Sequence, residues 1–288
     1  MIAGVSWAWW AGFHAVVAAI LTADSLVTGH WQAKRESGTA AWLGTVGLAV
    51  AAIGFACWMA VAQGRQTALE FVAGYAIEMS LSVDNLFLFL VLFEGFEISR
   101  QRQHKALVWG IWGAFGLRAA FIGAGVTLLR RFEGITWLFG LFLLYAAWGM
   151  VRGGSARAAI PQWIVRLQPA KGPLLPVIVA VEATDLLFAT DSIPAVLAVT
   201  HNPFVAYTSN VAAIVGLRSL YFGLAAMLDR FKYLHYGLGA LLAFAALKML
   251  AARWIEVPVT VSLAVMGAIL GASALGAEIG KRISRTAG

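Results

Sequence analysis

Apolar residues fill the chain in runs of about 20, separated by short polar breaks. A helix of about 20 apolar residues is long enough to cross the ~30 Å hydrocarbon core of a bilayer. The breaks carry most of the charge, together with turn residues such as Gly153 and Pro203. The pattern therefore predicts nine transmembrane helices, over residues 7–28, 41–62, 70–93, 106–129, 135–151, 174–199, 204–228, 235–252 and 257–278. The expected fold is an all-α, polytopic membrane helix bundle, a single transmembrane domain over 1–288.

Composition supports a membrane protein and excludes several other classes. Of the 288 residues 61% are hydrophobic and 12% charged, whereas a soluble domain has about 25% charged residues. An ordinary soluble enzyme or a nucleic-acid binder is therefore excluded despite the net charge of +7, and the lipid bilayer is the expected partner. The one cysteine, Cys57, lies in an apolar run, which excludes disulfides and thiolate metal sites. The first apolar run has no basic segment before it, so we interpret it as a helix of the mature protein and not as a signal peptide.

The distribution of basic residues predicts the orientation. Of the 21 Lys and Arg residues, 14 fall in breaks on one side of the predicted membrane and five, with Lys248 counted among them, fall on the other. Since cytoplasmic loops carry the excess of Lys and Arg, the N-terminus is expected outside and the C-terminus in the cytoplasm of a bacterial inner membrane.

An internal repeat divides the predicted helices. Residues 116–150 resemble 216–249, and the match includes an arginine within each predicted span, Arg118 and Arg218. Extended upstream, the match gives two three-helix units, 70–152 and 174–252. Because three is odd, the two units would enter the membrane from opposite sides, and such an inverted 3+3 repeat is typical of secondary transporters. Residues 1–69 would add two peripheral helices, and 257–288 would add a last helix and a cytoplasmic tail.

Acidic residues occur within the predicted spans of both repeats. A charge at the bilayer centre costs about 2.5–3.5 kcal/mol even on the mildest scale, so these residues require compensation. Five acids, Glu78, Asp84, Glu182, Asp185 and Asp191, together with Arg118 and Arg218 would carry a net charge of −3. A divalent cation would largely neutralise that charge. The candidate metal ligands are Glu78, Asp84, Asn85, Glu182, Asp185 and Asp191, with Asp24, Ser82, Ser192, Arg118 and Arg218 in supporting roles.

The chemistry of these side chains selects a class of ion. Carboxylate, amide and hydroxyl oxygens are hard donors that suit Mn²⁺, Ca²⁺ or Mg²⁺, whereas zinc and copper would favour His and Cys. Helix periodicity places Glu78, Ser82 and Asn85 on one face but puts Asp84 about 120° away from Glu78. Pro194 suggests a kink in the second acidic span. Either these helices are broken, so that both carboxylates reach one ion, or the two carboxylates serve separate functions.

Two acidic segments resemble a known family. Residues 74–85, GYAIEMSLSVDN, and 181–195, VEATDLLFATDSIPA, resemble the signatures of the TerC family, and the chain is most similar to its Alx-type members. The resemblance implies a nine-helix bundle related to the LysE transporter superfamily, tellurium resistance as the historical label, and Mn²⁺ export. It also implies functional roles for the six candidate ligands. One departure is Met79, where the family commonly has Lys.

The leading hypothesis is a non-enzymatic transporter that exports Mn²⁺, or another hard divalent cation such as Ca²⁺, in exchange for protons. Glu182 is the expected proton carrier, because its aligned position in the first repeat is Tyr75. The alternative is a non-transporting membrane component of tellurite or envelope-stress resistance. An intramembrane hydrolase is disfavoured, because no Gly-x-Gly-Asp signature is present. The oligomeric state stays open.

Overall fold

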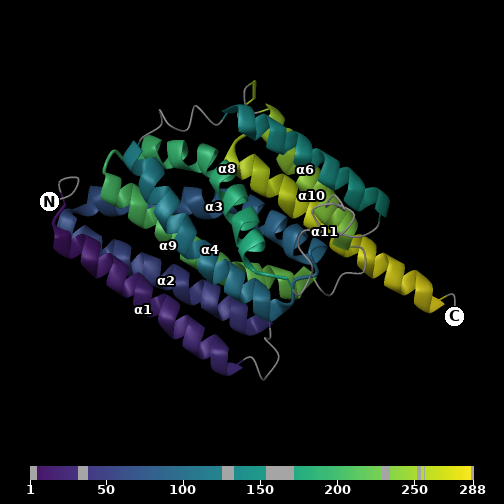
Figure 1. Ribbon diagram of the computed structural model, residues 1–288, viewed down its shortest axis with the longest axis horizontal. Coiled ribbons are helices and arrows are strands. Elements are labelled where there is room, and N and C mark those ends of the chain that lie inside the picture. Colours follow the sequence, from purple (N-terminus) through teal and green to yellow (C-terminus); the bar gives the residue numbers. More distant parts are fainter. Residues whose placement is uncertain are drawn as a thin grey trace.

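The computed structural model describes residues 5–31, 38–124, 133–153, 172–228, 234–251, 254–255 and 257–286 (Figure 1). Within these ranges its elements are nine α-helices. They are α1 (Trp7–Trp31), α2 (Gly38–Gln63), α3 (Arg65–Gly95), α4 (Arg100–Ala124), α6 (Glu133–Gly153), α8 (Leu175–Val199), α9 (Pro203–Leu228), α10 (Leu234–Ala251) and α11 (Val259–Thr286). The all-helical class and the positions of the helices are as the hydrophobic pattern predicts.

Several helices extend past the apolar runs that predicted them. α4 begins at Arg100 and not near 106, and α11 continues through the predicted cytoplasmic tail to Thr286. The apolar pattern did not predict these additional helical turns, because their polar residues lie beyond the hydrocarbon core while the helix continues. Two predicted breaks within the described residues are in place: Gly64 separates α2 from α3 with φ 98°, and the Asn202 side chain accepts a hydrogen bond from the Phe204 amide at the start of α9.

The helix α3 lies in the middle of the bundle and contacts α2, α8, α9, α10 and α11. α1 and α2 lie along one flank, and α6, α10 and α11 along the opposite one (Figure 1). Gly74 permits the close approach of α3 and α9, since a Cβ there would lie 2.6 Å from Ser209 Oγ. Contacts also join α3 to α8, α4 to α9 and α6 to α10, each helix with its aligned counterpart. The inverted relation of the two halves stays a prediction.

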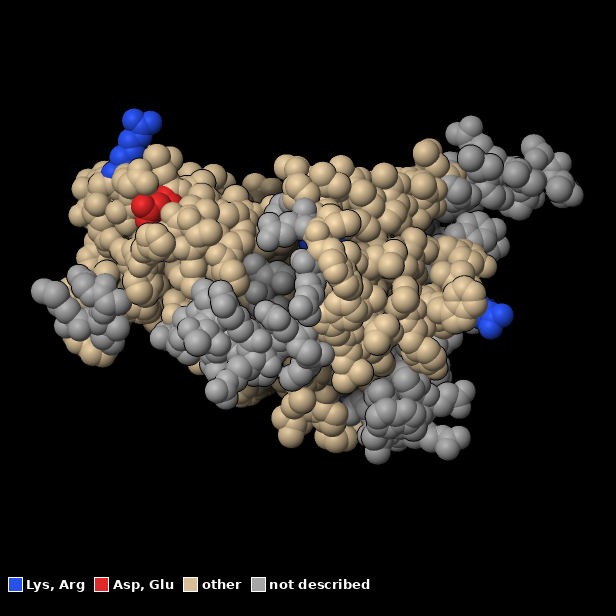
Figure 2. All heavy atoms as spheres, turned by 90° about the horizontal axis from the view of Figure 1, so that it is seen from above, with Lys and Arg blue, Asp and Glu red and all other residues tan. Residues whose placement is uncertain are grey.

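The described surface is apolar to an extent that suits lipid. Four helical segments are long and apolar enough to span a membrane: Ala41–Gln63, Arg65–Gly95, Arg100–Ile122 and Pro203–Ala226. α2 exposes a row of aliphatic side chains at helical spacing, including Val46, Val50 and Ile53. On the face seen in Figure 2 the described residues are almost entirely uncharged. The count of nine spans stays a prediction: the further apolar helical stretches within the described residues, Trp7–Thr22, Gly140–Arg152, Tyr236–Ala251 and Thr260–Ser273, have 10–17 residues.

Both acidic helices are continuous. α3 runs without interruption through Glu78 and Asp84, and α8 runs through Asp185 and Pro194. The hypothesis of broken helices is therefore wrong for this structure. Proline lacks an amide hydrogen, but one missing donor does not end a helix whose neighbours hold it by packing.

Candidate functional site

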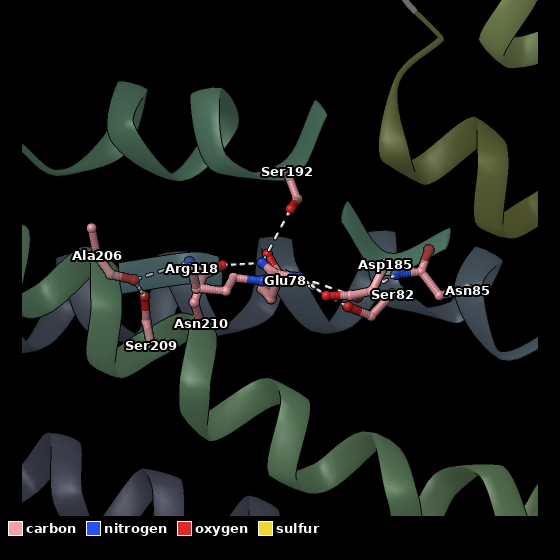
Figure 3. A network of polar contacts seen from close by, with 9 residues as sticks. All are labelled: Glu78, Ser82, Asn85, Arg118, Asp185, Ser192, Ala206, Ser209 and Asn210. Carbon is pink, nitrogen blue, oxygen red and sulfur yellow. Dashed lines mark hydrogen bonds and ion pairs between the residues drawn. The ribbon is translucent and has the colours of Figure 1, made fainter. Parts of the chain in front are cut away.

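A buried arginine organises the polar centre of the bundle. Arg118 on α4 is 1% exposed, and its Nη1 lies 2.7 Å from Glu78 Oε1 on α3. Its Nη2 lies 3.5 Å from both carboxylate oxygens of Asp185 on α8. It also donates to Ser192 Oγ at 3.3 Å and to the side-chain oxygen of Asn210 on α9. One guanidinium therefore connects all four central helices, as Figure 3 shows.

The polar face predicted for α3 is the face that points toward this arginine. Ser82 Oγ donates to Glu78 Oε1 at 3.1 Å, and Asn85 Nδ2 donates to Asp185 Oδ1 at 3.2 Å. Asp185 and Ser192, seven residues apart on α8, both contact Arg118. Helix periodicity thus predicted correctly that Glu78, Ser82 and Asn85 share one face. Arg118 is buried against Glu78 and Asp185, as expected.

A second cation, Lys248 on α10, lies beside Asp84, the second candidate acidic ligand on α3. Its Nζ is 2.9 Å from Asp84 Oδ2, and the two side chains are 15% and 4% exposed. The sequence interpretation had counted Lys248 among the loop residues, which is a correction. The signal was present, because Lys248 lies inside the predicted 235–252 span, but a lysine near a helix end commonly extends to the membrane interface.

Lys248 changes the charge balance. With Arg118 and Arg218 it makes three cations against the five predicted acids, so the expected net charge of −3 becomes −2. A single divalent cation would balance that charge. Against the net charge of −3 expected from the sequence, it would have left one negative charge.

A small cavity lies between α3, α8 and α10. Its volume is about 10 Å³, and it is lined by Glu78, Leu81, Ser82, Asp84, Asn85, Phe188, Ser192 and Lys248. Three buried oxygens of these residues have no hydrogen-bond partner among the described residues: Glu78 Oε2, Asp84 Oδ1 and Asn85 Oδ1. All three are hydrogen-bond acceptors. Buried acceptors normally have a partner, so these three need an explanation, and a cation is a partner that suits all of them.

Glu182 on α8 lies in a different setting, against α4. Its carboxyl group rests on the glycine surface of α4: a Cβ at Gly113 would lie 2.6 Å from its Cδ, and a Cβ at Gly110 would lie 3.2 Å from its Oε1. It shares a cavity of about 30 Å³ with Asp185 and Arg218, between α3, α4, α8 and α9. That volume has room for about two water molecules. Glu182 therefore does not line the same cavity as Asp84.

Two predicted site residues lie outside the described side chains. Asp24 is on α1 and Asp191 on α8, but only their backbones are described. Among the side chains that are described, no group of three or more His, Cys, Asp and Glu is gathered closely enough to hold a metal. Basic side chains separate the carboxylates instead, with Arg118 between Glu78 and Asp185, and Lys248 beside Asp84.

Sequence reasoning also missed Asn210. It is fully buried on α9, accepts from Arg118, and donates to the carbonyl oxygen of Ala206 at 2.9 Å. Its aligned position in the first repeat is Gly110, one of the two glycines that hold Glu182. A comparison of the two repeats position by position could have singled out both residues.

Comparisons with known proteins agree that the chain is an integral membrane protein. The profile described as "Integral membrane protein TerC family" matches residues 63–285. "Uncharacterized membrane protein STKORF319" of Myxococcus xanthus is 39% identical, with 96% of this chain and 94% of the relative covered. "Putative membrane-bound redox modulator Alx" is 37% identical in Escherichia coli (strain K12) and 36% identical in Salmonella typhi, with 91% of each chain covered. No solved structure matches the chain.

Proposed function

This chain belongs to the TerC family of multi-pass integral membrane proteins, and on that premise we propose that it is a secondary transporter that exports Mn²⁺ in exchange for protons. The ion would bind at the cavity between α3, α8 and α10, within a cytoplasmic membrane, with the N-terminus outside. The role is one of transport and not of catalysis.

The observation that carries the proposal is a set of three acceptor oxygens without a hydrogen-bond partner in the described part of the chain, Glu78 Oε2, Asp84 Oδ1 and Asn85 Oδ1, on residues that line one cavity. A buried polar atom without a partner destabilises a fold by about 1–3 kcal/mol, so three such acceptors on the residues of one cavity favour a bound partner such as a cation. Hard oxygen donors of this kind suit Mn²⁺, Mg²⁺ or Ca²⁺. The choice of Mn²⁺ among them comes from the family resemblance.

The size of the cavity favours a transporter with a closed binding site over an open channel. About 10 Å³ is space for one water molecule, so a divalent ion could enter only after it lost most of its hydration shell. Carboxylate and amide oxygens would replace that shell. A site that is closed around a dehydrated ion must open to one side at a time, which is the behaviour of a transporter with alternating access.

Protons are the proposed exchange partner because acids in a low-dielectric setting bind them readily once a cation leaves. Glu182, on its glycine surface beside Asp185 and Arg218, is the proposed carrier. It lies in a cavity apart from the three unpartnered oxygens, so ion and proton would use neighbouring positions linked through Arg118 and Asp185.

The name of the Alx relatives suggests a redox role, and the chain offers little for direct thiol chemistry. Its one cysteine, the exposed Cys57 on α2, has no second cysteine in the chain with which to form a disulfide. A change of metal level inside the cell would affect redox chemistry indirectly. A transporter is therefore compatible with the name.

The test is Mn²⁺ flux in proteoliposomes that contain the purified full chain and a Mn²⁺-sensitive dye. An imposed proton gradient should drive Mn²⁺ movement in the opposite direction. Glu78→Gln and Asp185→Asn should each abolish flux while the protein still inserts. Glu70→Gln is the matched control, since Glu70 is on the same helix α3 but hydrogen-bonds Thr200, and it should transport normally. Absence of flux in the wild-type chain would instead favour a non-transporting component of tellurite or stress resistance.

A further inference from the structure

We propose that Lys248 is a tethered counter-cation whose ammonium group competes with the divalent ion for Asp84. This inference rests on the proposed function and adds a role for a residue that the count of basic residues had placed among the breaks. The ammonium group would balance the acidic site between transport cycles. Entry of the ion would displace it, and its return would help to release the ion.

The first observation is the position of the ammonium group. Lys248 Nζ is 2.9 Å from Asp84 Oδ2, while the second oxygen of the same carboxylate, Oδ1, is buried and has no hydrogen-bond partner among the described residues. Lys248 also lines the cavity to which Glu78, Asn85 and Ser82 contribute oxygens. A cation of the protein itself thus lies at the edge of the oxygen-lined space.

The second observation is a difference in burial between the two cations that face this cavity's acids. Arg118 is 1% exposed and is held by contacts to residues of α3, α8 and α9. Lys248 is 15% exposed, and Asp84 is its one described polar contact. A long, flexible side chain with a single contact can leave once an incoming cation takes over that contact, whereas Arg118 cannot leave without breaking several contacts. Lys248 is therefore the mobile cation of the pair.

The third observation is that the pair occurs in one half of the molecule only. The position aligned with Lys248 in the first repeat is Gly149, which has no side chain to offer. A residue needed merely to pack the α6–α10 contact would not have to carry a charge. The location of the charge next to one acidic position favours a role at that position.

The experiment measures Mn²⁺ binding to the purified full chain in nanodiscs, from the loss of the electron paramagnetic resonance signal of free Mn²⁺. Lys248→Met and Lys248→Gln should each bind Mn²⁺ about tenfold or more tightly than wild type, because they remove the competing charge, and should turn over more slowly in flux assays. Lys248→Arg, which keeps the charge, should stay within a few fold of wild type. Lys105→Met is the control, since Lys105 is exposed on α4.

Other results would overturn the inference. Unchanged or weaker Mn²⁺ binding by folded Lys248→Gln would mean that Lys248 only stabilises the bundle. Failure of Lys248→Gln to fold even with saturating Mn²⁺ would also count against it, because the ion should replace the missing charge. If wild type itself bound no Mn²⁺, the proposed function would fail, whereas normal wild-type binding without a gain in the variants would refute the role of Lys248 alone.

Discussion

Replacement of Arg118 by leucine should destabilise the protein more than any single change at its surface. The substitution leaves the Glu78 carboxylate without the cation 2.7 Å away, and it removes the shared partner of Asp185. Loss of one member of a buried ion pair typically costs about 3–5 kcal/mol. Arg118→Lys keeps one charge but loses the fork that reaches Ser192 and Asn210, so a loss of about 1.5–3 kcal/mol is expected.

The size of the stability loss in Arg118→Leu distinguishes two explanations of the Arg118 contacts. A typical side-chain hydrogen bond inside a membrane protein is worth only about 0.6 kcal/mol, so a loss of that size would mean that Arg118 is a minor packing contact. A loss above about 3 kcal/mol would mean that it neutralises buried carboxylates.

Unfolding free energies can be measured in mixed micelles with a denaturing detergent, with tryptophan fluorescence as the signal. Arg65→Leu is the control, since Arg65 is exposed at the start of α3, and it should change the free energy by less than about 0.5 kcal/mol. Glu78→Gln should recover part of the loss in the Arg118→Leu background, because it removes one of the charges left unpaired. Equal stability of Arg118→Leu and wild type would refute the charge argument.

Two further predictions concern Glu182 and its surroundings. Apparent Mn²⁺ affinity should weaken as the pH falls from about 8 to 6, because a proton on Glu182 would reduce the negative charge next to the ion site, and Glu182→Gln should flatten that dependence. A wild-type affinity that does not vary with pH would leave a uniporter as the better description. Gly113→Ala should impair proton-coupled flux, because its Cβ would lie within 2.6–2.9 Å of the Glu182 carboxyl group, whereas Gly116→Ala on the same helix, with nothing within 4 Å, should transport normally. Equal flux in these two glycine variants would refute the proposed role of the glycine surface.

The hydrophobic pattern was sufficient to place the helices, because each apolar run must keep its side chains in the protein interior or in lipid along a whole span. It was also sufficient to put Glu78, Ser82 and Asn85 on one face, since that follows from 3.6 residues per turn. The burial of Arg118 could be anticipated because an arginine within a span has few alternatives to a carboxylate partner.

The position of Lys248 and the way Glu78 and Asp84 reach one cavity depended on tertiary packing. The sequence does not say whether a lysine near a helix end reaches for lipid headgroups or for an acid, so Lys248 was misplaced. Nor could it say whether Glu78 and Asp84 require a broken helix. In the structure both line one small cavity from an unbroken α3, because α8 and α10 cover adjacent sides of that helix.

The central claim is that a divalent cation binds among the oxygens of Glu78, Asp84 and Asn85. An anomalous-scattering map from crystals soaked in Mn²⁺ tests it most directly. The account predicts a peak in the cavity between α3, α8 and α10, with ligand oxygens about 2.0–2.6 Å away and the Lys248 ammonium displaced from Asp84. A map with Mn²⁺ bound elsewhere, or an ordered chain with no peak in this cavity at saturating Mn²⁺, would contradict it.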